Sequence, residues 1–266
     1  MVFGAILAGG SGTRMHISNM PKQFLPLDEK PIIIHTLEKL LMCTKIDVIY
    51  IGVNPAWLGY MSDLLEKYEL DFEDKIKLVP GGKNRNDTIF NIINDIEKTY
   101  GESEDNIIVT HDAVRPFVTL RILDENIENA ITYGACDTVV PAVDTIVVSK
   151  DAQQIDSIPD RSMMYQGQTP QTFKINILKE LYSQLKPSEK NILTDACKIC
   201  VMKGAPVKLV KGNSSNIKIT TISDYKIAQF LVGGNVVELE ENDRWLTIFI
   251  SLLLHSSFLL SMKILT

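Results

Sequence analysis

Residues 2–14 read Val2-Phe-Gly-Ala-Ile-Leu-Ala-Gly-Gly-Ser-Gly-Thr-Arg14. The apolar run Val2–Leu7 predicts a short buried β-strand, because it ends at once in Ala8-Gly9-Gly10. A glycine-rich turn after a strand presents backbone N–H groups in a concave array that suits a phosphate group. The first strand therefore predicts both a buried sheet and the edge of that sheet at which a ligand binds.

Strand-like and helix-like segments alternate from this turn to about residue 235. Asn54 with Pro55, Asn86 or Asp87, and Thr119 are the expected starts of helices. The alternation predicts an α/β fold with a mostly parallel sheet flanked by helices. Strands are expected at 2–7, 48–53, 77–79, 107–110, 207–210 and 216–219, and helices at 32–41, from 55, from about 87, from 120 to 133, at 175–185, at 194–203 and from 223.

The alternation is interrupted between residues 137 and 170. Residues 137–148 carry β-branched and small side chains around Pro141, and residues 163–168 form a second extended piece. Two extended pieces without a helix between them predict a β-arm or hairpin that projects from the sheet.

Composition limits the classes of protein and partner. The chain has 266 residues, of which 45% are hydrophobic, and 27 Lys and Arg against 33 Asp and Glu give a net charge of −6. These values exclude a disordered chain, a collagen-like repeat and a multi-span membrane protein. A mildly acidic chain has no overall attraction for nucleic acid, so an anionic ligand requires a local cluster of basic residues.

Four cysteines, Cys43, Cys136, Cys197 and Cys200, do not indicate a disulfide scaffold. The Cys197-x-x-Cys200 pair has no second ligand pair at zinc spacing, so buried helical thiols are favoured over a redox or metal role. With no secretory signal ahead of the first strand, the expectation is a reduced, cytoplasmic protein.

The end of the chain differs from the rest. Residues 236–243 are acidic and resemble a linker, and residues 245–262 carry no formal charge. Eighteen such residues only just reach the length of a membrane-spanning helix. Three interpretations stay open: a membrane anchor, which is not favoured, an amphipathic or partner-binding helix, and an incidental end left by truncation or frame shift of a longer chain. The folded domain is expected to end at residue 235.

The glycine turn matches neither of the two common phosphate-binding motifs. The P-loop pattern fails at every register, and Met15 stands where a dinucleotide fingerprint has its third glycine. Two cations, Arg14 and Lys22, follow the turn. They favour a phosphate-binding loop over a plain tight turn with solvated charges.

Three further segments follow predicted strands, where ligands bind in open α/β sheets. Gly81-Gly82-Lys-Asn-Arg85-Asn-Asp-Thr88 is a second glycine turn with its own arginine. His111-Asp112-Ala-Val-Arg115-Pro116 places a carboxylate that suits Mg²⁺ beside a polyphosphate. Asn216-Ile-Lys218-Ile-Thr220 places a lysine in an apolar strand, which taken alone is weak support for a site.

Together these motifs, in this order, resemble the cytidylyltransferases that load a sugar phosphate or polyol phosphate onto CMP. The resemblance covers about residues 1–232 and includes Pro21-Lys-Gln-Phe24 and Thr169-Pro-Gln171. It implies a Rossmann-like nucleotidyltransferase fold, CTP and a polyol phosphate as ligands, Mg²⁺ as cofactor, and a homodimer in which the β-arm reaches the partner's acceptor site.

The resemblance also implies roles for individual residues. Arg14 and Lys22 would be catalytic and Asp112 would hold the metal. Arg161 and Lys218 would bind the acceptor phosphate, with Asp144 and Thr145 nearby. The remaining substrate-binding residues would be Leu7, Ala8, Gly9, Gly10, Gly82, Lys83, Asn84, Arg85, Asn86, Asp87 and Thr88.

Two acceptors compete within the family: D-ribitol 5-phosphate, for teichoic acid or capsule polymers, and 2-C-methyl-D-erythritol 4-phosphate, for isoprenoids. Tyr165–Gln171 and Thr194–Lys198 resemble the ribitol enzymes, and Val143 stands where methylerythritol enzymes more often carry an arginine. We therefore expect ribitol 5-phosphate, with methylerythritol phosphate as the alternative. A nucleotide-binding regulator without turnover is the alternative of another class.

Overall fold

The computed structural model describes residues 1–10, 20–70 and 75–233. Met1–Ala228 forms one compact unit, and residues 229–266 form a second, of which only 229–233 are described. The expected domain end at residue 235 and the three interpretations of the tail lie outside the described residues. Within those residues, no helix has both the length and the apolar character needed to cross a membrane.

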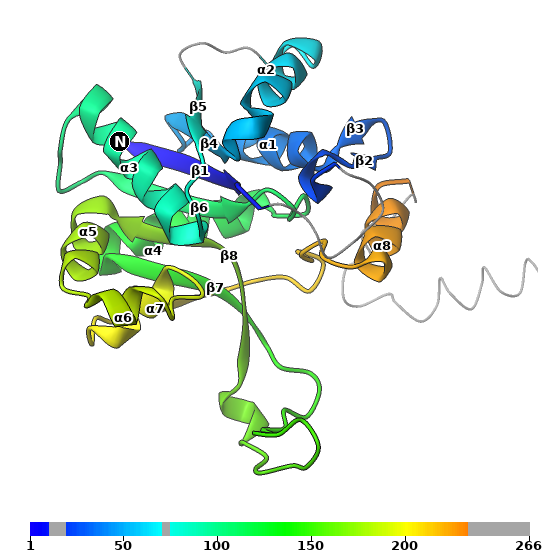
Figure 1. Cartoon of the computed structure of the whole chain (residues 1–266), viewed down its shortest axis with the longest axis vertical. Coiled ribbons are helices and arrows are strands. Elements are labelled where there is room, and N and C mark those ends of the chain that lie inside the picture. The colour runs from blue at the N-terminus through cyan, green and yellow to red at the C-terminus, as the bar shows by residue number, and fades with distance from the viewer. Residues whose placement is uncertain (11–19, 71–74, 234–266) are drawn as a thin grey trace, which may run out of the picture. The chain divides into compact units, whose positions relative to one another are not determined.

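Seven strands form the main sheet in the order β5-β4-β1-β6-β8-β7-β9 (Figure 1). Their bounds are β1 Val2–Ala8, β4 Val48–Val53, β5 Ile76–Pro80, β6 Ile107–Asp112, β7 Ala135–Pro141, β8 Tyr165–Lys174 and β9 Lys208–Lys211. β1 pairs in parallel with β4 and β6, β4 with β5, and β7 with β9, whereas β8 is antiparallel to both neighbours. The prediction of a mostly parallel α/β sheet is confirmed. β2 Pro26–Leu27 and β3 Lys30–Pro31 form a separate small hairpin.

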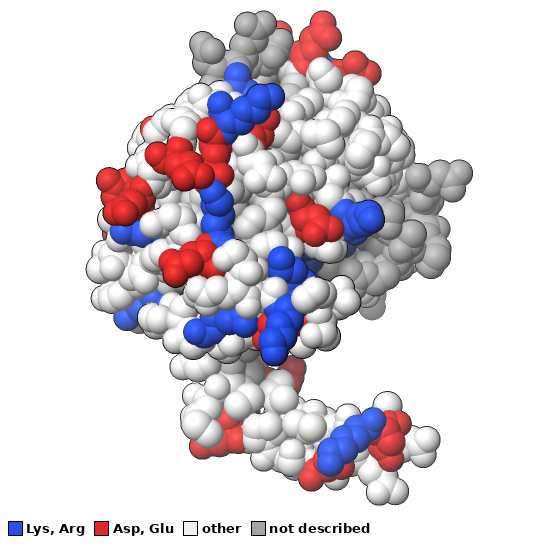
Figure 2. All heavy atoms as spheres, turned by 60° about the vertical axis from the view of Figure 1, so that its left-hand side comes forward, with Lys and Arg blue, Asp and Glu red and all other residues white. Residues whose placement is uncertain are grey.

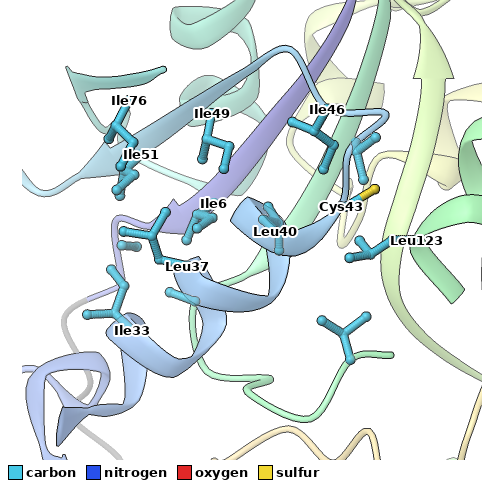
Figure 3. Close-up of a cluster of buried hydrophobic side chains, with 14 of the residues drawn as sticks. Ile6, Ile33, Leu37, Leu40, Cys43, Ile46, Ile49, Ile51, Ile76 and Leu123 are labelled. Atoms are coloured by element: carbon cyan, nitrogen blue, oxygen red, sulfur yellow. The ribbon is translucent and has the colours of Figure 1, made fainter. Parts of the chain in front are cut away.

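Helices cover both faces of this sheet, because the side chains of each strand alternate between the two faces. The helices are α1 Ile32–Met42, α2 Leu58–Lys67, α3 Arg85–Tyr100, α4 Leu120–Tyr133, α5 Ile175–Ser183, α6 Pro187–Lys190, α7 Cys197–Met202 and α8 Ile222–Gly233, with short 3-10 helices η1 Lys22–Phe24, η2 Pro55–Trp57 and η3 Arg161–Met163. Ile6, Ile49 and Ile51 pack under α1 with Leu37 and Leu40 (Figure 3). On the other face, strand residues such as Phe3 and Tyr50 pack with α3, α5 and α7. This three-layer arrangement leaves the ends of the strands free to form a site.

Most predicted elements occur where expected. Asn54 and Thr119 accept the capping hydrogen bonds of η2 and α4, as predicted. α3 is different: it begins at Arg85, because the Asn84 side chain accepts from the backbone N–H of Asp87. The cap expected at Asn86 or Asp87 is therefore wrong by two or three residues.

Residues 216–220 do not form the expected strand. Arg115 donates to the carbonyl of Asn216 at 2.6 Å, and the Ile219 N–H donates to the carbonyl of Val114 at 3.0 Å. The segment therefore follows the turn after β6 rather than joining the sheet as a strand.

The arm is a hairpin, but a shorter one than expected. Much of β7 and β8 belongs to the main sheet, and residues 142–164 form the part that projects below it (Figure 1). Val148 and Ser157 pair as an isolated antiparallel bridge within it.

On the face shown in Figure 2, acidic and basic side chains are interspersed over the body and the arm, without a large patch of one sign.

Candidate active site

A pocket of about 640 Å³ opens where β1 and β6 end, at the predicted ligand-binding edge. Residues from both glycine turns, from the end of β6 and from the 216–220 segment line it. Its lining residues are Leu7, Ala8, Gly9, Gly10, Lys22, Gln23, Asn54, Gly82, Lys83, Asn84, Arg85, Thr88, Asp112, Ala113, Val114, Thr194 and Lys218. Most of the predicted nucleotide-binding residues are among them. Asn86, which is buried within α3, and Asp87 are not.

The first glycine turn is held by a residue that the sequence interpretation did not place in the site. The buried Gln23 side chain donates to the carbonyls of Ala8 at 2.8 Å and Gly10 at 3.2 Å. The signal was present in the sequence, since Gln23 belongs to the Pro-Lys-Gln motif next to Lys22. Arg14 lies outside the described residues.

The second glycine turn lies against the start of α3. A Cβ added at Gly82 would come within 2.2 Å of the Asp87 Cβ, so only glycine fits there. The Gly82 N–H donates to Thr88 Oγ1 at 3.0 Å, which fixes the turn on the first helical turn. The backbone N–H groups at the helix N-terminus favour an anion, so this edge of the pocket suits a phosphate group.

Asp112 ends β6 among three cations. Its carboxylate contacts Lys218 Nζ at 2.8 Å and Arg115 Nε at 3.6 Å, and it also forms an ion pair with Arg85 Nη1. Its side chain is only 7% exposed. Burial by itself would raise the pKa of this carboxyl, but Arg85 and Lys218 outweigh burial and hold the pKa well below its usual range. Asp112 is therefore a permanent anion that gathers positive charge in the pocket.

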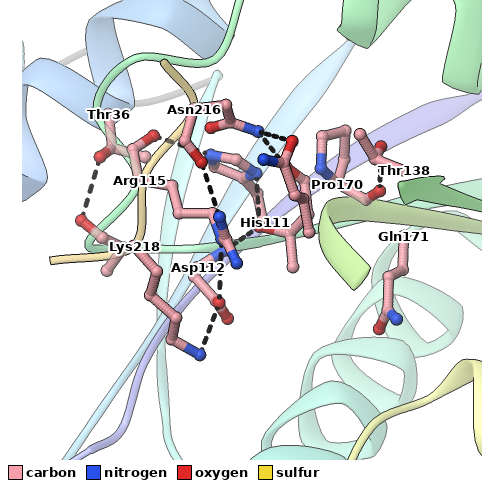
Figure 4. A network of polar contacts seen from close by, with 12 residues as sticks. Thr36, His111, Asp112, Arg115, Thr138, Pro170, Gln171, Asn216 and Lys218 are labelled. Atoms are coloured by element: carbon pink, nitrogen blue, oxygen red, sulfur yellow. Dashed lines mark hydrogen bonds and ion pairs between the residues drawn. The ribbon is translucent and has the colours of Figure 1, made fainter. Parts of the chain in front are cut away.

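His111 does not line the pocket, and both of its ring nitrogens lie in a buried hydrogen-bond network (Figure 4). Its Nε2 lies 3.0 Å from the Arg115 carbonyl, and its Nδ1 lies 2.9 Å from Thr169 Oγ1. Thr169 Oγ1 also accepts from the Asp112 N–H at 3.2 Å. Burial lowers the pKa of His111 to about 4, so the ring is neutral and fixes the backbone on both sides of Asp112.

Arg115 and Asn216 connect the lysine segment to β6. Arg115, whose guanidinium pairs with Asp112, donates to the Asn216 carbonyl, while the Asn216 side chain donates to the Thr169 carbonyl at 2.9 Å. Lys218 follows two residues later and reaches the same carboxylate (Figure 4). The placement of Lys218 thus depends on residues more than 40 positions away in the sequence.

The described pocket residues could hold Mg²⁺ through a single carboxylate. Asp112 is the sole carboxylate among the described residues that line the pocket. Those residues contain no group of three or more His, Cys, Asp or Glu placed to hold a metal. Mg²⁺ needs only one or two carboxylates when phosphate oxygens and water complete its shell, so Asp112 fits a metal that enters with a nucleotide. Such a metal would replace at least one ion pair of Asp112.

Three predicted acceptor residues do not reach the pocket of their own chain. Asp144 and Thr145 are exposed on the arm. Arg161, in η3, donates to the Val143 carbonyl at 3.0 Å. Lys218 alone of the predicted acceptor residues lines the pocket.

The cysteine pair has the expected structural role. Cys197 and Cys200 are buried free thiols on α7, and burial raises the pKa of Cys200 to about 11. A thiol of that pKa is neither a ready nucleophile nor a ready metal ligand near neutral pH.

Residues 2–234 match the family model of 2-C-methyl-D-erythritol 4-phosphate cytidylyltransferase (IspD). The chain belongs to this family. It is a cytidylyltransferase with the Rossmann-like nucleotidyltransferase fold.

Solved structures agree with the family. The 4-diphosphocytidyl-2C-methyl-D-erythritol synthase of Anaerococcus prevotii DSM 20548 is similar at 26% identity and a TM-score of 0.71, over 87% of this chain and 96% of that one. The Francisella tularensis 2-C-methyl-D-erythritol 4-phosphate cytidylyltransferase is similar at 26% identity and a TM-score of 0.69, over 86% and 98%. The Thermus thermophilus cytidylyltransferase, at 21% identity and a TM-score of 0.67 over 88% and 100%, shares the fold.

These matches favour the alternative acceptor over the expected one. The family model and both 26%-identical structures carry the name of the methylerythritol enzyme, so the expectation of ribitol 5-phosphate is not supported, and the stated alternative is favoured.

Proposed function

We propose that this cytidylyltransferase transfers CMP from CTP to 2-C-methyl-D-erythritol 4-phosphate, giving the CDP-polyol and pyrophosphate. The match of residues 2–234 to the family of that name carries the proposal. D-Ribitol 5-phosphate is the second candidate, because Val143 stands where methylerythritol enzymes more often carry an arginine.

The reaction needs positioning and charge neutralisation more than a base. A phosphate monoester has its second pKa near 6, so the acceptor oxygen is already ionised at neutral pH. This oxygen attacks the α-phosphorus of CTP in line, a new P–O bond forms, and the bond to the bridging oxygen of pyrophosphate breaks. The cost lies in bringing two anions together, which fixed cations and a preformed pocket reduce.

The residues divide this work along the pocket. The turn at Gly82 and the start of α3 would hold the CTP phosphates, and Lys22 with Arg14 would stabilise charge on the α-phosphorus and the leaving group. Lys218 would bind the acceptor phosphate. Asp112 would hold Mg²⁺, which supplies charge neutralisation to the triphosphate when bound.

The arm supports a homodimer. It exposes large apolar side chains, and Val143 is 81% exposed. The others on or beside it are Val147, Val148, Ile155, Ile158, Met163 and Tyr165. If a partner subunit covers this surface, Arg161, Asp144 and Thr145 on the arm of one chain would lie at the acceptor end of the partner's pocket.

A substrate panel tests the function. Pyrophosphate release is measured with CTP and Mg²⁺ plus methylerythritol 4-phosphate, ribitol 5-phosphate or glycerol 3-phosphate. The proposal expects the highest kcat/KM with methylerythritol phosphate. A preference for ribitol phosphate would establish the second candidate, and no release with any acceptor would indicate a nucleotide-binding protein without turnover.

A further inference from the structure

Beyond Asp112, β7 and β8 hold a second acid that the reaction as described does not use. Asp137, on β7, is half-buried, and Gln171 Nε2 on β8 donates to Asp137 Oδ1 at 3.1 Å. Gln171 also pairs in register with Thr110 on β6, two residues before Asp112. Figure 4 shows the Gln171 side chain pointing to the same side of the sheet as Asp112 and Lys218.

Several polar atoms in this region are left without a protein partner. Gln171 is 4% exposed, and its Oε1 accepts no hydrogen bond from the described residues. Arg85 Nε and Nη2 likewise donate to no group among the described residues, whereas Arg85 Nη1 pairs with Asp112. Unsatisfied buried polar atoms are costly, so their presence beside a pocket indicates groups that a ligand completes.

The surroundings of Asp137 disfavour the ionised form of its carboxyl group. Burial raises its pKa to about 6, and the nearby Asp195 adds to this effect, while the hydrogen bond from Gln171 and the Arg85 charge oppose it. A Cβ added at Gly167 would meet only Asp137 Oδ2, at 3.7 Å, so there is room for a carbon atom between Gly167 and this oxygen. A partly desolvated acid with open space beside it is an available acceptor.

The position along the sheet separates this region from the nucleotide. The glycine turns follow β1 and β5, whereas β8 and β7 lie on the other side of β6. Asp112, Lys218 and Thr194 line the pocket, whereas Asp137 and Gln171 lie beyond these lining residues. A ligand that reaches Asp137 therefore belongs to the acceptor end.

We propose that Asp137 and Gln171 form a hydroxyl-binding subsite for the polyol chain of the acceptor. Hydroxyl groups both donate and accept, so a polyol chain can donate to Asp137 and Gln171 Oε1 and accept from the Arg85 donors that have no partner among the described residues. The subsite rests on the proposed function and deepens it: it makes the carbon chain of the acceptor, and not only its phosphate, a determinant of specificity.

The test compares Asp137→Val, which removes the polar group, with the conservative Asp137→Asn and with Asp63→Asn on the exposed face of α2 as a matched control. Dissociation constants for methylerythritol 4-phosphate, ribitol 5-phosphate and glycerol 3-phosphate are measured by calorimetry in the presence of CTP without Mg²⁺. Asp137→Val should weaken binding of the longer polyols about ten- to a hundredfold, with glycerol phosphate and CTP changed less than about twofold. Asp137→Asn should recover part of the loss.

Equal losses for all three phosphates, or none, would overturn the subsite, provided that thermal unfolding shows a folded variant. Turnover of the wild type is measured in parallel. If the wild type binds and converts no polyol phosphate, the proposed function fails and the subsite with it. If conversion is normal and Asp137→Val binds every acceptor as the wild type does, only the subsite fails.

Discussion

The pocket and the arm each carry a cation predicted to bind the acceptor phosphate, and the two cations have different partners. In the pocket, Lys218 is held by Asp112, and Asp112 is buried among cations. On the arm, Arg161 is exposed, and its guanidinium donates to a backbone carbonyl. Lys218 is exposed but is fixed by an ion pair with a buried carboxylate, so it acts at little further entropic cost, whereas Arg161 is fixed only against a backbone carbonyl. The pocket cation is thus positioned by its own chain, whereas a role for the arm at an acceptor site rests on the proposed dimer.

The largest effect is expected where the pocket's charges meet. Asp112→Asn keeps the shape of the side chain but removes the anion that pairs with Arg85, Arg115 and Lys218. We expect kcat to fall about a hundredfold or more and the Mg²⁺ requirement to rise, because charge placement supplies most of the catalysis. Rates as a function of Mg²⁺, with thermal unfolding as control, measure this. A wild-type rate at ordinary Mg²⁺ would show that Asp112 does not hold the metal.

The next prediction tests the pocket cation Lys218 and the arm cation Arg161 one at a time. Lys218→Ala and Arg161→Ala should each raise the acceptor KM about ten- to a hundredfold and lower kcat, with CTP affinity nearly unchanged. Lys22→Ala should instead lower kcat, with a smaller change in acceptor KM.

Mixing the two acceptor variants shows which chain supplies Arg161. If the arm acts across a dimer, half of the randomly mixed dimers contain one site with both wild-type residues, so about a quarter of the wild-type activity returns. If Arg161 serves its own chain, every site lacks one residue and no activity returns. Gel filtration of the mixture verifies that dimers form and exchange.

A smaller effect concerns the network behind the pocket. His111 is buried with its pKa lowered to about 4, so the unfolded chain binds the proton more tightly. Its contribution to stability is present above pH 6.5 and is lost as pH falls toward 4, by at most about 3 kcal/mol. The stability difference between the wild type and His111→Gln should therefore shrink as pH falls from 7.5 to 5, measured by urea unfolding.

The variant must be compared with the wild type, because the contribution of Asp137 to the free energy of unfolding changes with pH in the opposite direction to that of His111. Its pKa is raised to about 6, so its contribution is greatest at low pH and is lost as pH rises through 6. Because Asp137 is present in both proteins, its contribution cancels in the difference between the His111→Gln and wild-type stability curves. Parallel curves would mean that His111 is not buried as a neutral ring.

The smallest effect is expected at the end of the chain. Every motif that resembles the family ends before residue 221, and α8 ends at Gly233. A chain that ends at Asn235 should therefore keep its dimerisation, kcat and both KM values within about twofold of the full chain, as a change remote from the site does. Aggregation or loss of dimers in the shortened chain would place the apolar tail within the folded domain.

The sequence alone determined the local features. Short apolar runs, glycine turns and caps such as Asn54 and Thr119 depend on neighbouring residues, so the order of strands and helices could be predicted together with both glycine turns and Asp112. The cap of α3 was predicted at Asn86 or Asp87 instead of Asn84, because several polar residues in a row could serve and only the backbone geometry chooses among them.

Only the tertiary structure decided which distant residues meet. Lys218 reaches Asp112 because Arg115 and Asn216 fold one segment against another, and Gln171 meets Asp137 because β8 runs antiparallel between β6 and β7. Neither contact has a signal in sequence spacing, since long-range packing and strand order set both. The sequence placed Arg161 on the predicted arm and the resemblance gave it an acceptor role, whereas only the fold shows that this arm projects below the sheet (Figure 1) and that Arg161 does not line the pocket of its own chain.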